Sequence, residues 1–181
     1  MSRRIKQRKR FFLAVEGESE QSFIKWIGRL ADEQGLHVHL ETRVIGGGGF
    51  SNLVSEAHRM RTVAARHGTP FRESFLVIDS DRAETGDWST DRVRAHAKEL
   101  GLIVCFQRPN HEGVILRMFR GNEISNFSRS SVDHQIQAVW PNYQKGQNAE
   151  KIAQRYLVDD LIRMAKYDED WKCLLKAIGL M

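Results

Sequence analysis

The chain has 181 residues, of which 28 are Lys or Arg and 23 are Asp or Glu, giving a net charge of +5. This length fits one domain, or one domain with a small appendage, and no apolar run approaches the roughly 20 residues of a membrane span. The apolar stretch after the basic start is too short for a signal peptide. The two cysteines form no CxxC, which disfavours a disulfide framework or zinc ribbon and favours a reducing cytoplasm.

The positive charge is concentrated at the start of the chain. Residues 1–10 carry six Lys or Arg and no acid, whereas the rest of the chain carries 22 basic against 23 acidic residues. We therefore expect a flexible basic tail on a near-neutral body. Such a tail can bind nucleic-acid phosphates, and a solubilising arm without a ligand is the alternative. The candidate nucleic-acid contacts of the tail are Arg3, Arg4, Lys6, Arg8, Lys9 and Arg10.

Apolar runs of strand length alternate with helical periodicities in the first two thirds of the chain. Three runs are continuously apolar, which indicates strands buried on both faces, and one alternates, which indicates a strand near a sheet edge. The expected strands are residues 11–15, 36–45, 74–78 and 102–106. The expected helices between them are residues 20–34, 52–67 and 90–100, the first two capped by Ser19 and Ser51. This order predicts an α/β fold with a mainly parallel sheet of about four strands and helices on both faces.

The last third of the chain has a different pattern. Residues 121–131 are polar and predict a loop, and helical periodicity is expected at residues 114–119, 148–166 and 168–178. We divide the chain into a basic tail (1–10), an α/β catalytic core (11–120) and a helical C-terminal extension (121–181).

Acidic residues follow three of the four predicted strands. Glu16 follows the first, Asp79 and Asp81 the third, and Glu112 the fourth. The carboxyl ends of parallel strands meet at one edge of a sheet, so these carboxylates can converge there. Mg²⁺ takes oxygen ligands and keeps several waters, which suits such a cluster. The alternatives are a turn or cap role for the aspartates and a helix-dipole role for Glu16, and the pattern also fits a phosphatase or a receiver-type domain.

Four segments resemble motifs of Toprim domains. LAVEGESEQSFI is similar to their opening strand, Glu-Gly and acidic helix, and FLVIDSDR is similar to their Asp-x-Asp motif. RPNHEGVILRMF and the later PNYQKGQNAEKIAQRY resemble the corresponding segments of the RloB-like and OLD-like Toprim proteins of bacterial defence loci. The resemblance covers roughly residues 11–166 in order and spacing, and it implies a Toprim-like sheet with a helical extension.

The resemblance also implies roles for individual residues. It makes Glu16 the acid/base and metal-site glutamate, Asp79 and Asp81 the Mg²⁺ or Mn²⁺ ligands, Glu112 an accessory acid and Lys145 a phosphate contact. In such a site a basic group stabilises the charge that develops on phosphate, and Arg82 is a second candidate besides Lys145. No side chain stands out as an obligatory covalent nucleophile, which favours hydrolysis over strand passage.

Two departures from the family pattern concern the metal site. Position 83 is Ala where a third acid often follows, with Glu84 one residue further on, and His111 stands beside Glu112 in place of an apolar residue. The sequence is therefore compatible with one metal ion or two in this site, and with full or reduced activity.

From the sequence we predict a cytoplasmic, Mg²⁺-dependent Toprim endonuclease acting on DNA or RNA, with the resemblance implying a role in anti-phage defence. The alternatives are a non-catalytic nucleic-acid-binding or regulatory subunit that works with a partner ATPase, and a small-molecule phosphatase. Nothing in the sequence predicts membrane association, and an oligomer is compatible with it.

Overall fold

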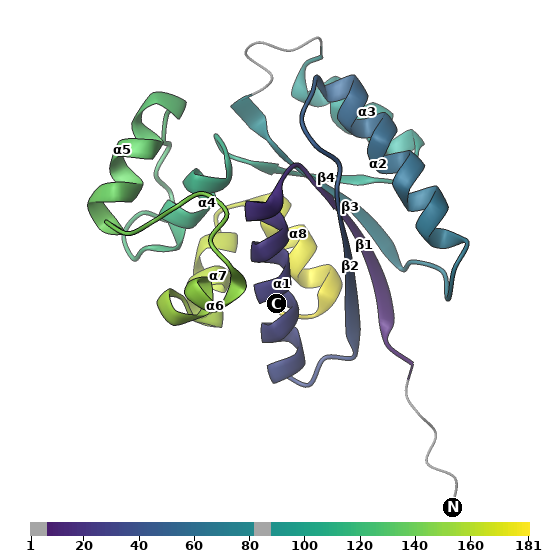
Figure 1. Cartoon of the computed structure of the whole chain (residues 1–181), viewed down its shortest axis with the longest axis horizontal. Helices are drawn as coiled ribbons and strands as arrows, with labels where there is room; N and C mark the ends of the chain where they lie inside the picture. Colours follow the sequence, from purple (N-terminus) through teal and green to yellow (C-terminus); the bar gives the residue numbers. More distant parts are fainter. Residues whose placement is uncertain (1–6, 82–87) are drawn as a thin grey trace, which may run out of the picture.

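The computed structural model describes residues 7–81 and 88–181, in which strands and helices alternate before a run of helices ends the chain (Figure 1). The strands are β1 (Lys9–Val15), β2 (Val38–Val44), β3 (Glu73–Asp79) and β4 (Ile103–Gln107). The helices between the strands are α1 (Glu18–Glu33), α2 (Phe50–Ala65) and α3 (Thr90–Glu99). The helices after β4 are α4 (His111–Met118), α5 (Arg129–Val139), α6 (Ala149–Arg155), α7 (Val158–Ala165) and α8 (Glu169–Ile178).

The four strands of the described chain form one parallel sheet in the order β2-β1-β3-β4. From β1 the chain moves outward to β2, then returns to place β3 on the other side of β1. The direction of winding therefore reverses between β1 and β3, and the carboxyl ends of these two strands flank the crevice where open α/β sheets bind ligands. The predicted α/β fold class and the edge position of β2 are confirmed.

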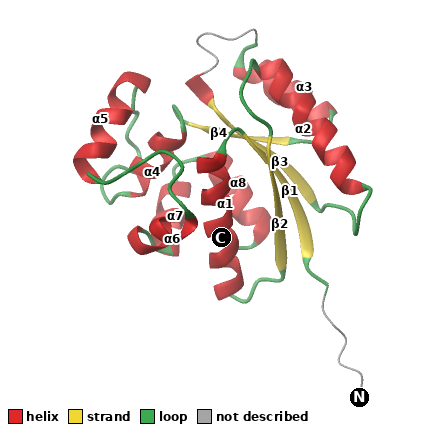
Figure 2. Cartoon of the chain, viewed as in Figure 1, coloured by secondary structure: helices red, strands yellow, loops and turns green. Residues whose placement is uncertain are grey.

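Helices cover both faces of the sheet, as Figure 2 shows. Alternate residues of β1 point to opposite faces: Phe11 and Leu13 pack in a cluster with α1 and α8, and Phe12 and Ala14 pack in a second cluster with α2 and α3. Because both faces are buried, β1 and β3 need apolar residues at successive positions, which explains the continuous runs in the sequence.

The helices after β4 extend the larger of the two clusters. Val132 of α5, Ile152 of α6 and Trp171 of α8 lie in the same hydrophobic cluster as Phe11, so residues before and after position 120 share one core. No helix in the described part of the chain combines the length and apolarity that crossing a bilayer would require.

Several helix boundaries differ from those predicted. The first two helices begin after Gly17 and Gly49, and neither Ser19 nor Ser51 is a cap. The Ser19 hydroxyl instead accepts a hydrogen bond from Gly146 N at 2.8 Å, a contact that only the tertiary fold creates. The single helix expected over residues 148–166 is two helices, α6 and α7. Tyr156 at the break is buried, with its hydroxyl donating to Ile115 O at 3.3 Å.

Candidate metal and phosphate site

Two carboxylates meet where β1 and β3 end. Glu16 directly follows β1, and Asp79 is the last residue of β3. The Asp79 backbone N–H donates a hydrogen bond to Glu16 Oε1 at 2.8 Å, which joins the two strand ends across the switch point. Glu16 is 8% exposed, and Asp79 Oδ1 is buried without a hydrogen-bond partner in the described chain. The sequence-based prediction that these two acids lie together is confirmed.

Asp81 is held against the turn that follows β4. Its backbone N–H donates to Pro109 O at 3.1 Å, and the Ser80 hydroxyl donates to the same carbonyl at 3.3 Å. The Asp81 side chain is 8% exposed and forms an ion pair with Arg129, whose Nε lies 3.3 Å from Asp81 Oδ2. The turn after β3 is thus fixed to the turn after β4, and Asp81 faces the first residue of α5.

Glu112 enters the site from the first turn of α4. Asn110 caps this helix by accepting a hydrogen bond from Gly113 N at 3.1 Å. The Tyr143 hydroxyl donates to Glu112 Oε1 at 3.1 Å, and Lys145 Nζ lies 3.9 Å from the same oxygen. A carboxylate in the first turn of a helix is favoured by the helix dipole. The geometry therefore places Glu112 and Lys145 beside each other.

Gly113 is required where α4 packs against the preceding turn. A Cβ atom at this position would lie 2.5 Å from Arg108 O and 2.6 Å from Pro109 Cδ, so the backbone would have to move. We expect Gly113→Ala to destabilise the protein by about 1–3 kcal/mol and to lower Tm by about 3–9 °C, measured by thermal unfolding. Gly28→Ala is the matched control, because its Cβ would meet only Leu40 Cδ1 at 3.8 Å. Equal Tm values for the two variants would contradict this account of α4.

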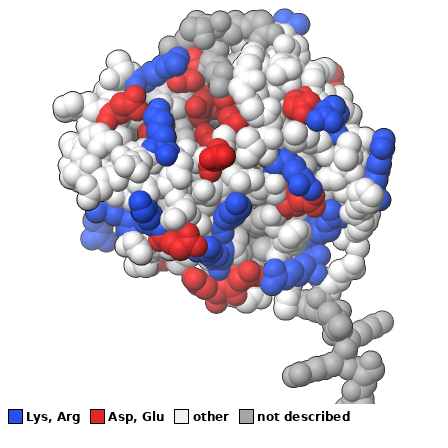
Figure 3. Space-filling model, viewed as in Figure 1, with Lys and Arg blue, Asp and Glu red and all other residues white. Residues whose placement is uncertain are grey.

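Asp79, Asp81 and Glu112 line a common pocket of about 310 Å³ at the carboxyl edge of the sheet. Its lining residues are Asp79, Asp81, Asn110, Glu112, Arg129, Asp133 and Lys145. Four carboxylates face two basic groups, so the pocket carries excess negative charge. In Figure 3, acidic side chains gather on the upper part of the visible face with basic side chains beside them.

The electrostatics of the pocket act most strongly on Asp79. Burial raises the pKa of Asp79 from its ordinary value of 3.8 to about 8, with further contributions from the negative charges of Glu16, Glu20, Asp81 and Glu112. Near neutral pH, the pocket without a cation therefore favours a proton on Asp79. A divalent cation would offset the same repulsion and hold the carboxylate in its charged form.

The donor set fits a hydrated magnesium ion better than a fully coordinated metal. Mg²⁺ binds through one or two carboxylates and keeps several of its waters, and Asp79 Oδ1 is a buried oxygen that lacks a partner. Within residues 7–81 and 88–181, no group of three or more His, Cys, Asp or Glu side chains is arranged to hold a metal ion. Asp79 and Asp81 are the two carboxylates of the pocket that could hold such an ion.

Tyr143 is a hydrogen-bond donor in this site and is poorly suited to be a nucleophile. Burial raises its pKa well above the usual range, and the charge of Glu112 and the hydrogen bond to it raise the pKa further. The phenol therefore stays protonated and fixes the Glu112 carboxylate.

Four residues of the site were not identified from the sequence. Glu20 is buried in the first turn of α1 and acts on Asp79 through its charge. Asn110, Arg129 and Asp133 line the pocket. Glu20 follows Glu16 by four residues, which is a signal, but an acid at a helix start is common for dipole reasons alone. Arg129 and Asp133 come from a segment whose helix α5 and position beside the sheet are tertiary features.

Of the seven basic residues expected to bind nucleic acid, the structure describes Arg8, Lys9 and Arg10, and none of these three lines the pocket. Arg3, Arg4, Lys6 and Arg82, like positions 83 and 84, fall outside the described residues. The strand β1 begins at Lys9, so Lys9 and Arg10 belong to the sheet and not to a tail, at the end of β1 opposite to Glu16.

Two residues of the basic segment form ion pairs within the protein. Arg8 lies 3.0 Å from Asp32, and Arg10 lies 2.6 Å from Glu41 and also donates to His67 O at 2.9 Å. The Arg10 side chain is 13% exposed, which leaves little of it for a ligand. Arg10 therefore has a structural role, in the pairing of β1 and in these contacts.

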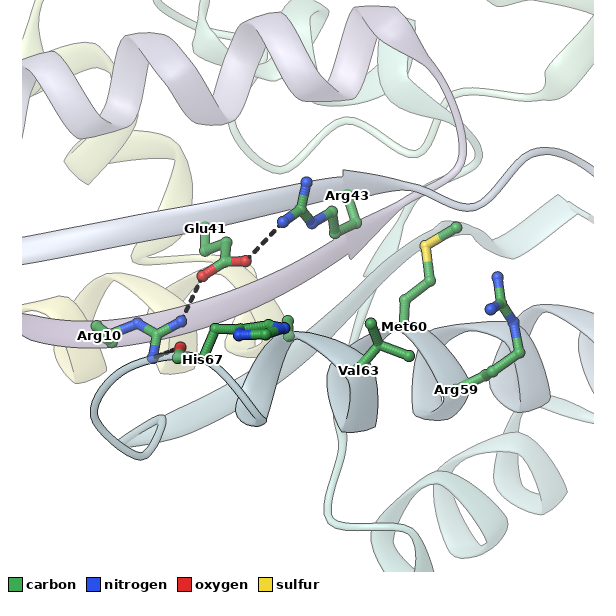
Figure 4. A pocket seen from close by; sticks show the side chains of 8 residues that line it. Arg10, Glu41, Arg43, Arg59, Met60, Val63 and His67 are labelled. Carbon is green, nitrogen blue, oxygen red and sulfur yellow. Dashed lines mark hydrogen bonds and ion pairs between the residues drawn. The ribbon is translucent and has the colours of Figure 1, made fainter.

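A second pocket, of about 450 Å³, lies between β2 and α2 (Figure 4). Its one carboxylate, Glu41, binds Arg10 and lies 2.9 Å from Arg43, and these contacts lower the pKa of Glu41 against the effect of burial. Met60 and Val63 of α2 form its apolar wall. This pocket has no cluster of acids and is remote from the ends of β1 and β3, so it does not compete as a metal site.

Structural comparison aligns the chain with the C-terminal regions of OLD proteins. That region of the Xanthomonas campestris pv. campestris OLD protein aligns at 13% identity and a TM-score of 0.46, covering 95% of this chain and 97% of that chain. A second structure of it aligns at 15% identity and a TM-score of 0.34, covering 95% and 79% of the two chains. The C-terminal region of the Burkholderia pseudomallei OLD protein aligns at 13% identity and a TM-score of 0.35, covering 93% of this chain and 87% of that chain. No family model and no curated protein matches the chain.

Proposed function

We propose that the chain is a Mg²⁺-dependent nuclease that hydrolyses phosphodiester bonds in DNA or RNA. The observation that carries the proposal is the convergence of Asp79, Asp81 and Glu112 on one pocket at the carboxyl edge of the sheet, with Glu16 beside Asp79 and with Asp79 Oδ1 buried without a hydrogen-bond partner in the described chain. Such a cluster of acids repels a phosphate unless a cation lies between them. A nuclease with a bound divalent cation makes use of this arrangement.

The proposed roles follow from the position of each side chain. Asp79 and Asp81 would hold the ion, which when bound polarises a phosphoryl oxygen and stabilises developing charge. Glu16 is fixed beside Asp79 by the Asp79 N–H, and from there it would exchange a proton with water or with the leaving oxygen. Lys145 is 66% exposed beside Glu112, so its ammonium can reach a phosphate at the mouth of the pocket.

The resemblance to RloB-like and OLD-like Toprim proteins supports nucleic acid over a small phosphomonoester as the substrate. It also extends the proposal to a cytoplasmic role in bacterial anti-phage defence, alongside a partner ATPase. The four motifs that carry this resemblance contain Glu16, Asp79, Glu112 and Lys145, which lie at or beside one pocket.

A cleavage assay tests the proposal directly. Supercoiled plasmid and total RNA are incubated with the wild-type chain in Mg²⁺, Mn²⁺ or EDTA, beside Asp79→Asn and the control Asp159→Asn, an exposed acid of α7. We expect metal-dependent cleavage by the wild type and the control, and none by Asp79→Asn. Cleavage that persists in Asp79→Asn would show that this pocket is not the active site. Binding without cleavage in either metal would favour the non-catalytic module, and release of phosphate from a phosphomonoester alone would favour the phosphatase.

A further inference from the structure

Arg129 connects the acidic pocket to a larger polar pocket beside it. The larger pocket, of about 710 Å³, is lined in part by Ser80, Arg108, Ser128 and Arg129. Ser80 stands between the two aspartates of the candidate metal site, and Arg129 and Asp133 line both pockets. A nucleic acid whose scissile phosphate met Asp79 and Asp81 would therefore have room for its next phosphate beside Arg129.

The contact between Arg129 and Asp81 is suited to being exchanged. Arg129 uses Nε at 3.3 Å from a carboxylate that is almost fully buried, while its own side chain is 64% exposed. A guanidinium has five N–H donors, and this contact leaves the paired Nη groups available for a second acceptor. Moving away from Asp81 changes the solvation of Arg129 little, because most of its side chain is already exposed to water. Asp81 itself needs a replacement cation before the contact can break.

We propose that Arg129 is a substrate-phosphate ligand that neutralises Asp81 until a divalent cation takes its place. The proposal rests on the proposed nuclease function and names a residue of that same site. When the ion binds Asp81, the guanidinium is released and turns toward the larger pocket, where its planar fork binds a phosphate through two hydrogen bonds. Metal binding and substrate binding are thereby coupled through one side chain.

Lys145 cannot supply this exchange. Its Nζ lies 3.9 Å from Glu112 and 3.6 Å from Asp133, and the larger pocket does not include it. Lys145 thus pairs with Glu112 and Asp133 and not with Asp81. Arg129 is the basic residue of the described chain that touches both Asp81 and the larger pocket.

The test compares Arg129→Gln with Arg66→Gln, which removes the same charge at the C-cap of α2. Mg²⁺ affinity is measured by titration calorimetry without nucleic acid. Since Arg129 competes with the ion for Asp81, Arg129→Gln is expected to bind Mg²⁺ up to about fivefold more tightly, and Arg66→Gln as the wild type does. An unchanged or weaker Mg²⁺ affinity in Arg129→Gln would overturn the proposal.

The second readout is binding of fluorescein-labelled single-stranded DNA and RNA oligonucleotides by anisotropy. With Ca²⁺ present, Arg129→Gln is expected to bind about tenfold more weakly than the wild type, whereas in EDTA the two are expected to be equal. Equal loss in EDTA and in Ca²⁺ would overturn the exchange. Arg129→Lys keeps the charge but not the fork, so near wild-type Mg²⁺ affinity with intermediate oligonucleotide binding is expected.

These readouts separate the inference from the proposed function. If the wild-type protein cleaves no nucleic acid, the nuclease proposal is wrong. The measurements of Mg²⁺ affinity and oligonucleotide binding would still test the proposed role of Arg129. A wild-type nuclease whose KM and Mg²⁺ affinity are unchanged in Arg129→Gln would overturn the inference and leave the function standing.

Discussion

Replacing Asp79 by Asn is expected to abolish metal-dependent cleavage and to stabilise the metal-free protein. The loss of activity should be at least about a hundredfold, because the variant removes a carboxylate and a negative charge that would hold the ion. The gain in stability follows from the burial of Asp79 Oδ1 among the carboxylates of the pocket. Functional residues often destabilise the protein in the absence of its ligand, because they are selected for the reaction and not for stability.

The stability effect depends on pH in a defined direction. The pKa of Asp79 is about 8 in the folded protein against an ordinary 3.8, so the folded state binds the proton more tightly than the unfolded chain. The stability of the metal-free wild type therefore falls as the pH rises from about 4 to about 8. Asn cannot ionise, so Asp79→Asn avoids this loss, and its advantage should amount to several kcal/mol at about pH 8.

Thermal unfolding in EDTA at about pH 5 and about pH 8 measures the effect. Asp79→Asn should unfold about 5–10 °C above the wild type at the higher pH, with a smaller difference at the lower pH. Addition of Mg²⁺ should raise the Tm of the wild type and leave that of the variant unchanged. A variant less stable than the wild type at both pH values would contradict the assignment of Asp79 as a buried, repelled carboxylate.

Asp168→Ala is expected to produce the largest loss of stability away from the pocket. Asp168 Oδ1 caps α8 by accepting from Asp170 N at 3.1 Å and Trp171 N at 3.3 Å. Its Oδ2 lies 3.3 Å from Arg117 Nη2, an ionic contact without hydrogen-bond alignment, and Arg108 contacts the same carboxylate. Removing the carboxylate leaves the Arg117 guanidinium buried without its counter-charge, which costs about 3–5 kcal/mol, and loss of the cap adds about 1 kcal/mol.

Urea unfolding separates the two contributions. Asp168→Asn keeps a cap acceptor but loses the charge, so its midpoint should lie between those of the wild type and Asp168→Ala, with an unchanged m-value. Asp159→Ala, an exposed acid of the first turn of α7, is the control and should cost less than about 0.5 kcal/mol. If Asp168→Ala matched that control, the buried ion pairs would contribute nothing measurable.

The sequence identified the sheet because the burial of β1 and β3 on both faces requires continuous apolar runs. It located Glu16 and Asp79 correctly, since parallel strands bring their carboxyl ends to one edge whatever the details of packing. Helix starts were less predictable. Ser19 is a good cap by residue type, but its hydroxyl binds Gly146 N, more than a hundred residues away in the chain. Local preference was overridden by a long-range contact.

By itself, the sequence determined the α/β class, the parallel order of strands and helices, and the group of strand-end acids, because each depends on periodicity and on residues close in the chain. Only the tertiary structure decided that Glu20, Arg129 and Asp133 join those acids, that Tyr143 donates to Glu112, and that Arg10 is held by Glu41. These contacts join segments that no local pattern relates. The overall charge of +5 therefore describes the pocket poorly: its lining has four carboxylates and two basic groups.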